Sequence, residues 1–387
     1  MKKSLVFLSS EVYGGPHNEL CNLNRYLSEN DWKIEVVIPE ENLYCKRRLE
    51  AANINVHVLP FKRLQTSPIK IFKYLFDLRK QMRYFRVLIR RIEPDVVQIY
   101  NFSNLEVSYI ANQFNVPILW KLVDSRFPKH LGKWLVQILK HKINVIMTTG
   151  RNLGFEHFGL KVDDNWFYYY PVFDNENSEI VRPREYLRSI LGVSSTQILI
   201  GSLANFNKQK NQEAIVRNYN KIFGNDEKFA LRLRGNSTKS NNYLKRLEKL
   251  LKNMEMPREV IGGLENIMTP KEFLSILDFH VIASSSRSEG FPNVIAECIG
   301  VKTVIISTAV GSIADLIENF QSGILMAPNR ISKELAKIFC SIKSGRLNLN
   351  KMKKDFDFKE GISTLIDDNY RIHVRALNLA SDRVINN

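Results

Sequence analysis

Short apolar runs that alternate with amphipathic helical stretches restrict the fold of this chain more than any other feature. A first series comprises Ser4–Leu8, Ile34–Ile38, Val56–Leu59, Val96–Tyr100, Ile118–Val123 and Val145–Thr148. A second series comprises Ile198–Leu203, Ala230–Leu233, Val260–Ile261, His280–Ala283 and Thr303–Ser307. Strands that alternate with helices indicate a parallel sheet covered by helices, and two separate series indicate two such sheets.

The length of 387 residues is also more than one ordinary core accommodates, which favours two domains. Proline and polar residues cluster between the two series, in the segment Tyr168–Glu185, where a boundary is expected. We therefore predict an N-terminal Rossmann-like domain over residues 1–180 and a C-terminal one over 181–365.

Composition excludes several classes of protein. With 44% hydrophobic and 25% charged residues the chain has the composition of a globular protein. The four cysteines lack the short spacing of a zinc site or a disulfide framework. The sequence also predicts no signal peptide and no membrane-spanning run, so a cytoplasmic location is expected. The net charge of +16 requires an anionic partner: nucleic acid, a phosphate-rich ligand or an acidic membrane surface.

Glycines follow the first predicted strand. Gly14 and Gly15 are expected to form a turn closed to residues with a Cβ, and Pro16 suits the first turn of a helix. Free N–H groups at such a helix start can bind a phosphate. A glycine turn that merely joins a strand to a helix explains the pattern equally well.

Two lysines follow the first strand of the second series. Lys208 and Lys210 lie in the segment GSLANFNKQKNQ, just beyond Ile198–Leu203. Ligands of open parallel sheets bind beyond the carboxyl ends of the strands, so an ammonium there can reach a diphosphate. A solvated surface lysine remains the alternative for either residue.

The segment RSEGFPNVIAE carries the most specific pattern, because it holds Glu289 and Glu297 eight positions apart. Asn293 can begin a helix that includes Glu297, and the turn before it exposes amides at Phe291 and Asn293 that suit a phosphate. Paired carboxylates can serve acid–base catalysis, a metal, or the hydroxyls of a ligand. No His or Asp companions stand at metal-ligand spacing, so we expect a site without metal that binds hydroxyl groups.

With these motifs the sequence resembles the retaining glycosyltransferases of family four over nearly its whole length. The similar segments are Gly14-Gly15, EPDVVQIYN, VPILWKLVD, ANFNKQKNQ, the paired-glutamate motif and TAVGSIADLI. The resemblance implies the α/β class and the GT-B fold, in which two Rossmann-like domains with parallel sheets face each other. It also implies that the last helix, residues 366–387, crosses back to the first domain.

The resemblance implies roles for individual residues. Glu289 would bind the hydroxyls of the donor sugar and Glu297 the ribose hydroxyls. Lys210 and Glu289 would be the catalytic residues, and Lys210, together with nearby amides, would stabilise the leaving diphosphate. The donor-binding residues implied are Gly14, Gly15, Asn205, Ile267, Gly290, Phe291, Pro292, Asn293, Val294 and Glu297, with the backbone of Ile267 facing the base.

Two positions depart from the family pattern. Val123 and Tyr100 stand where many members have histidines, and the first of these histidines is thought to contact the donor sugar. Asp124 and Asn101, their neighbours, are candidates for replacement polar contacts. The departures leave the donor sugar open and keep a non-catalytic, sugar-nucleotide-binding or partner-binding member of the same fold as the alternative function.

A basic helix is predicted between Lys62 and Arg91, where ten Lys and Arg residues accompany a single acid, Asp77. An apolar stripe at spacings 4-3-4-3-4-3 covers one helix face and is expected to dock on the first sheet. Its members are Ile71, Leu75, Leu78, Met82, Phe85, Ile89 and Ile92. The other side of this helix carries aromatic side chains among lysines and arginines, a combination that suits an anionic membrane surface. The alternative is a solvated face whose aromatic side chains pack on a neighbouring loop. The predicted membrane-facing residues are Phe72, Lys73, Phe76, Lys80, Arg83 and Arg90.

These observations predict a retaining, metal-independent glycosyltransferase that uses a nucleotide-diphosphate sugar, with no cofactor. Its acceptor is expected to be a lipid-linked or surface-polysaccharide intermediate at the cytoplasmic membrane, with the enzyme attached peripherally. No nucleic-acid recognition motif is present, so nucleic acid is not an expected partner.

Overall fold

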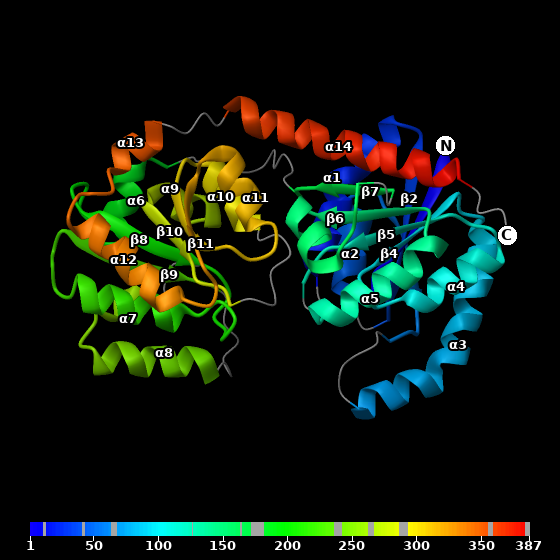
Figure 1. Ribbon diagram of the computed structural model, residues 1–387, viewed down its shortest axis with the longest axis horizontal. Helices are drawn as coiled ribbons and strands as arrows, with labels where there is room; N and C mark the ends of the chain where they lie inside the picture. The colour runs from blue at the N-terminus through cyan, green and yellow to red at the C-terminus, as the bar shows by residue number, and fades with distance from the viewer. Residues whose placement is uncertain are drawn as a thin grey trace. The chain divides into compact units, whose positions relative to one another are not determined.

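The computed structural model divides the chain into two compact units: residues 1–174 with 364–387, and residues 175–363. It describes the chain except residues 11–12, 41–42, 63–67, 126, 163–164, 172–181, 236–241, 262–266, 286–292, 355–358 and 384–387. The side chains at 68–71, 73, 258, 293, 319–320 and 359–364 are also outside the description. Each unit is an α/β layer structure, shown with its element labels in Figure 1.

The first unit contains a seven-stranded parallel sheet in the order β3-β2-β1-β4-β5-β6-β7. Its strands are β1 (Lys2–Phe7), β2 (Trp32–Pro39), β3 (Asn55–Leu59), β4 (Val96–Tyr100), β5 (Ile118–Leu122), β6 (Val145–Thr149) and β7 (Trp166–Tyr169). Successive side chains of a strand point to opposite faces, and both faces of this sheet are apolar. Leu5 and Phe7 therefore enter one core layer, while Val6 and Leu8 enter the other.

Helices cover both faces of this sheet. On the Phe7 side lie α3 (Pro68–Ile92), α4 (Leu105–Gln113) and α5 (Lys129–Leu139), and on the other lie α1 (Gly15–Glu29), α2 (Leu43–Ala51) and α14 (Lys359–Ser381). Two short helical segments, η1 (Lys140–Lys142) and η2 (Leu153–Phe158), come after α5 in the chain. In the second layer Ala376, Leu377 and Ala380 of α14 are fully buried, so the end of the chain completes the core of the first unit.

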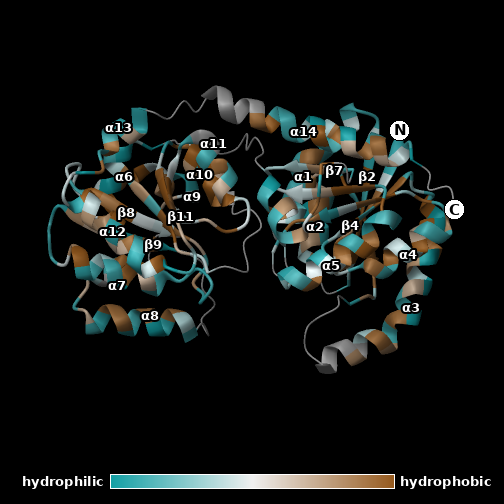
Figure 2. Ribbon diagram, viewed as in Figure 1, coloured by the Kyte–Doolittle hydropathy of each residue, from teal (hydrophilic) through white to brown (hydrophobic). Residues whose placement is uncertain are grey.

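The second unit contains a five-stranded parallel sheet in the order β12-β11-β10-β8-β9. Its strands are β8 (Ile198–Leu203), β9 (Phe229–Arg234), β10 (Phe279–Ile282), β11 (Val304–Thr308) and β12 (Gly323–Met326). Its helices are α6 (Arg184–Ile190), α7 (Gln212–Ile222), α8 (Asn242–Asn253), η3 (Arg258–Val260), α9 (Pro270–Ile276), α10 (Asn293–Gly300), α11 (Ile313–Phe320), α12 (Ile331–Lys343) and α13 (Leu349–Lys354). Strands such as β11 are among the most hydrophobic parts of the structure (Figure 2).

The predicted fold class is confirmed, with three local differences. β7 and β12 were not predicted, and Val260–Ile261 is not a strand: Val260 ends η3 and Ile261 makes an isolated bridge to Leu233. β12 begins very close to its neighbour, because a Cβ on Gly323 would lie 1.9 Å from the carbonyl oxygen of Ile305. A short strand that begins with such a glycine lacks the β-branched pattern by which strands are recognised.

The apolar stripe of α3 does not dock along its whole length. Phe85, Ile89 and Ile92 are buried as predicted, but Leu75 is 57% exposed, and the side chain of Ile71 lies outside the described residues. A helix of 25 residues is about 37 Å long, whereas a five-residue strand such as β4 spans only about 17 Å. The first half of α3 therefore extends beyond the sheet, as Figure 1 shows.

Among the described residues, none of the helices combines the length and the apolarity needed to cross a membrane.

Candidate functional site

In each sheet the strand order reverses beside the first strand of the unit. In the second unit the reversal lies between β8 and β10, and in the first unit it lies between β1 and β4. At such a point the connections leave in opposite directions, and a crevice opens beyond the carboxyl ends of the two strands. The predicted site segments follow three of these four strands.

The segment after β8 places Lys210 beside the end of β10. The amide of Ser285, just beyond β10, donates to the carbonyl of Gln209 at 2.9 Å. The amide of Lys210 donates to the side-chain oxygen of Asn207 at 3.0 Å, which closes a tight turn. The lysine loop thus lies against Ser285, two positions before the paired-glutamate segment begins.

His280 lies where the pairing of β8 with β10 ends. Ladder pairing of the two strands ends at the pair His280 and Gly201, and beyond it the amide of Leu203 donates to His280 Nε2 at 2.9 Å. The ring thus takes the position of a ladder partner, so the strands diverge toward their carboxyl ends. Burial, together with the charge of Lys210, lowers the pKa of His280 to about 3, so the ring is neutral at pH 7. Its Nδ1 is buried and has no hydrogen-bond partner among the described residues.

Glu297 lies in the second turn of α10 and is partly buried. Burial raises the pKa of its carboxyl, and the charge of Lys271 on α9 opposes that rise. A carboxylate in this setting has lost part of its hydration, which makes hydrogen bonds from ligand hydroxyls more favourable. Val294, one turn earlier, is also partly buried.

Of the other donor-binding residues predicted in this unit, some are described by the structure and some are not. Asn205 is exposed, and its carbonyl accepts from Gln212 at 3.1 Å. Ile267 is 38% exposed, and its carbonyl accepts from Arg182 at 2.7 Å, so this oxygen is already engaged. The predicted contacts of Glu289, Gly290, Phe291 and Pro292, and of the side chain of Asn293, lie outside the described residues.

In the first unit the glycine pair begins α1 as predicted, but its backbone differs from the expectation. Gly14 is extended, with φ −159°, a conformation open to any residue, and Gly15 begins the helix. A Cβ on either glycine would meet no atom within 4 Å. The pair therefore leaves space in front of the helix start rather than forming a left-handed turn. His17 accepts from the Gly14 amide at 3.2 Å, and burial lowers its pKa to about 4.

Tyr100 and Val123, which stand where many family members have histidines, both take part in hydrogen bonds within the first unit. Tyr100 is 5% exposed, and its hydroxyl donates to Glu19 at 3.2 Å. Asn101 donates to Asp124 at 2.9 Å and accepts from the Val123 amide at 2.8 Å. Asn101 and Asp124 thus join the carboxyl ends of β4 and β5 to each other.

A buried charged network that the sequence analysis missed lies behind this edge. Lys121 on β5 is 1% exposed and donates to Glu19 of α1 at 2.6 Å. Tyr169 donates to the other Glu19 oxygen at 2.7 Å, and His373 Nε2 of α14 lies 3.6 Å from Glu19. Burial would raise the pKa of Glu19, but the charge of Lys121 and hydrogen bonds outweigh burial and lower it to about 2. The network joins α1, the sheet and α14.

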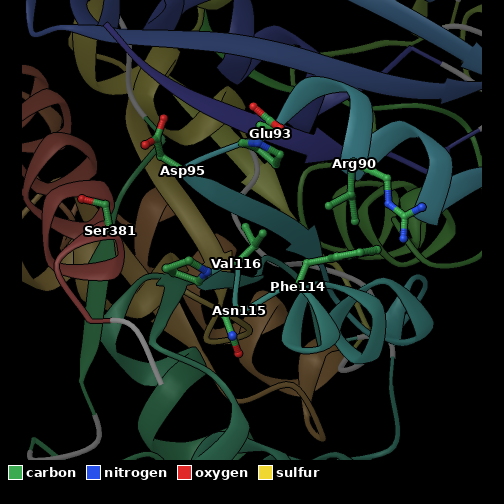
Figure 3. A pocket seen from close by; sticks show the side chains of 10 residues that line it. Arg90, Glu93, Asp95, Phe114, Asn115, Val116 and Ser381 are labelled. Atoms are coloured by element: carbon green, nitrogen blue, oxygen red, sulfur yellow. The ribbon is translucent and has the colours of Figure 1, made fainter. Parts of the chain in front are cut away.

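A pocket of about 460 Å³ lies at the opposite, amino-end edge of the first sheet (Figure 3). It is lined by Ile89, Arg90, Glu93, Pro94, Asp95, Phe114, Asn115, Val116, Pro117 and Ser381. Arg90 covers the ring of Phe114 at 5.4 Å. Because ligands of such sheets bind at the carboxyl ends, this pocket is not the predicted site. Among the described residues, no three His, Cys, Asp or Glu side chains are grouped so as to hold a metal.

Comparison with known proteins identifies the architecture. Residues 183–356 match the family model described as glycosyl transferases group 1. No functionally curated protein matches the sequence. HepE of Anabaena, solved in complex with UDP, superposes with a TM-score of 0.72 at 17% identity, covering 96% of this chain and 98% of that one.

Two further structures have the same fold. A glycosyltransferase from Rickettsia africae superposes with a TM-score of 0.72 at 16% identity, over 100% of this chain and 99% of that one. The pneumococcal O-GlcNAc transferase GtfA, solved with UDP and GlcNAc, superposes with a TM-score of 0.66 at 9% identity, over 97% and 99%. At these identities the structural likeness concerns the fold, which is GT-B.

Proposed function

We propose that this chain is a glycosyl transferase of group 1, the family whose model matches residues 183–356, and that it transfers a sugar from a nucleotide-diphosphate donor with retention of configuration. The observation that carries the proposal is the junction of the Lys210 loop with the end of β10, at the strand reversal and directly before the segment that leads into α10. Two solved structures with this fold contain UDP, which makes a uridine diphosphate leaving group the first candidate.

In the proposed mechanism the second unit binds the nucleotide. Glu297 accepts hydrogen bonds from the ribose hydroxyls, and Lys210 stabilises the diphosphate as negative charge develops on it. Preorganised charges act most strongly when charge grows in the transition state. A protonated His280 would repel the nearby Lys210 ammonium. Because the His280 ring is neutral, Lys210 keeps its positive charge for the diphosphate.

We propose that the donor reaction requires no metal. Lys210 and backbone amides at the start of α10 would neutralise the diphosphate, a role that a divalent cation plays in other transferases. The acceptor hydroxyl would attack from the face that the phosphate leaves, and Glu289 would bind hydroxyls of the transferred sugar.

For the acceptor we propose a lipid-linked or surface-polysaccharide intermediate at the cytoplasmic face of the membrane. The support comes from α3, whose projecting half exposes Phe72 (72%) and Phe76 (82%). Lys80, Arg83 and Arg90 on the same helix are also exposed. The predicted contact of Lys73 lies outside the described side chains.

A non-catalytic, nucleotide-binding function is the second candidate, and the hydrogen bond of Tyr100 to Glu19 favours it. This bond engages a side chain at a position where many relatives have a histidine. Such a protein would bind the nucleotide without releasing a diphosphate from the donor, so turnover separates the two candidates.

We expect Glu297→Ala to weaken the binding of UDP by about 1–3 kcal/mol, because a charged acceptor of ribose hydroxyls is removed. Isothermal titration calorimetry of the full chain measures this change. Glu248→Ala, on the exposed face of α8, is the matched control and should bind UDP as the wild type does. Equal affinities of wild type and Glu297→Ala would contradict the assignment of the ribose site.

A further inference from the structure

The outer face of α5 exposes an apolar surface that folding of the first unit does not use. Leu131, Trp134 and Ile138 are 46%, 58% and 49% exposed and stand at positions i, i+3 and i+7, which share one helix face. The helix docks through its other side, where Gly132 and Val136 are buried. Gly132 lies against Phe158 and Phe127, and a Cβ there would be 3.3 Å from the Phe158 ring. Grouped exposed apolar side chains indicate an interaction surface.

The surroundings of this face are basic. Residues 129–142 contain Lys129, Lys133, Lys140 and Lys142, two histidines and no acidic residue. The ion pair of Lys129 with the following helix is loose, with Lys129 Nζ 3.9 Å from Glu156. An apolar helix face with a large aromatic ring, next to an exposed arc that carries Lys129 and Lys133, matches the pattern of helices that lie in the plane of an anionic bilayer.

The same layer of the first unit carries further exposed apolar side chains. α3, α4 and α5 all pack over one face of the sheet, and α3 contacts α4. Their outward residues include Phe72, Leu75 and Phe76 of α3 and Tyr109 of α4. A single bilayer that contacts this layer can therefore meet α3 and α5 together.

We propose that α5 is a membrane-inserting helix, which places Leu131, Trp134 and Ile138 at the headgroup–acyl boundary of an anionic bilayer. Lys129 and Lys133, on the neighbouring arc of the helix, contact the lipid phosphates. This inference extends the membrane association proposed above for α3, and it adds a second set of apolar contacts to those of Phe72 and Phe76. Binding to lipid needs no donor or acceptor, so it is tested independently of glycosyl transfer.

The chain provides its own probe for this contact. Of the four tryptophans, Trp32 and Trp120 are fully buried, and Trp166 is partly buried with its indole N–H donating to Thr148 at 2.8 Å. Trp134 is the exposed one. Its emission shifts to shorter wavelength when the ring leaves water, and bromine atoms on acyl chains quench it only at contact.

The test is tryptophan emission of the full-length protein mixed with vesicles of phosphatidylglycerol and phosphatidylcholine that carry brominated acyl chains. We expect a blue shift and quenching, both absent from Trp134→Phe. Neutral phosphatidylcholine vesicles should give little effect, because the lysines then lack a partner. The double variant Leu131→Ser/Ile138→Ser should lose at least about tenfold in vesicle affinity by sedimentation, since two apolar chains no longer enter the bilayer.

Three results would overturn the proposal. The first is vesicle binding that leaves the emission of Trp134 unquenched and that is lost in the variant Lys73→Gln/Lys80→Gln/Arg83→Gln/Arg90→Gln. This result would locate the membrane contact on α3 alone. The second is a blue shift without lipid that follows protein concentration, which would show a second copy on this face. The third is equal binding of the double variant and the wild type. Unchanged thermal unfolding of each variant without lipid establishes that the fold is intact.

Discussion

Replacing Lys210 by alanine is expected to lower turnover of the sugar donor by about a hundredfold or more, with a smaller effect on donor affinity. Charge on the diphosphate increases as the glycosidic bond breaks, so a lysine that contacts it acts more strongly on the transition state than on the bound donor. The loop that carries Lys210 is held against the end of β10 through Ser285, so the substitution leaves the backbone of the site in place.

Release of UDP from UDP-sugars, measured at saturating and limiting donor, separates these two effects. Lys208→Ala is the matched control, since Lys208 is exposed two positions earlier in the same loop and should retain wild-type turnover. Wild-type turnover in Lys210→Ala would show that the ammonium does not act on the leaving group. Equal losses in the two variants would assign the effect to the general positive charge of the loop.

Replacing Glu19 by alanine is expected to lower the free energy of unfolding of the first unit by about 3–5 kcal/mol. The substitution leaves the Lys121 ammonium, which is 1% exposed, without its carboxylate, and it removes the acceptor of the Tyr100 and Tyr169 hydroxyls. An unpaired buried charge costs far more than the net contribution of the pair it belonged to. Urea unfolding followed by circular dichroism measures the change.

The double variant Glu19→Ala/Lys121→Met is the control for this interpretation. Because it removes both charges, it should recover a large part of the stability lost in Glu19→Ala. The pH dependence is a second control. The folded pKa of Glu19, about 2, lies below its ordinary value of 4.5, so this stabilisation is present above pH 4.5 and is lost as pH falls toward 2. A Glu19→Ala protein as stable as the wild type would contradict the network.

The sequence predicted the strands around the site well, because their apolar runs are bounded by turn residues. Val96–Tyr100 and Ile198–Leu203 have the predicted bounds in the structure. β7 escaped prediction because its residues, Trp166–Tyr169, are aromatic throughout and adjoin the polar segment between the units. The docking of α3 could not be read from its spacing, since periodicity shows which residues share a face and not where the sheet beneath them ends.

The candidate site was predicted in part for a similar reason. Lys210 and Glu297 stand out because each follows a strand end, and strand ends are visible in the sequence. Lys121 also carried a signal, a charge within the buried run ILWKL, but its partner Glu19 is 102 positions away. His280 likewise interrupts an apolar run, and its role at the divergence of β8 and β10 depends on strand order. Partners of this kind are set by tertiary packing.

The central claim is that this chain binds a nucleotide diphosphate as the leaving group of a sugar donor without a metal. Thermal unfolding with UDP, GDP and their sugar conjugates, in EDTA, tests it most directly. At one hundred times its Kd, a ligand should raise the unfolding free energy of the second unit by about 2.7 kcal/mol, and the gain should diminish in Glu297→Ala. The account predicts such a shift for UDP or GDP with EDTA present. A shift that appears only after magnesium or manganese is added, or no shift with any nucleotide, would contradict it.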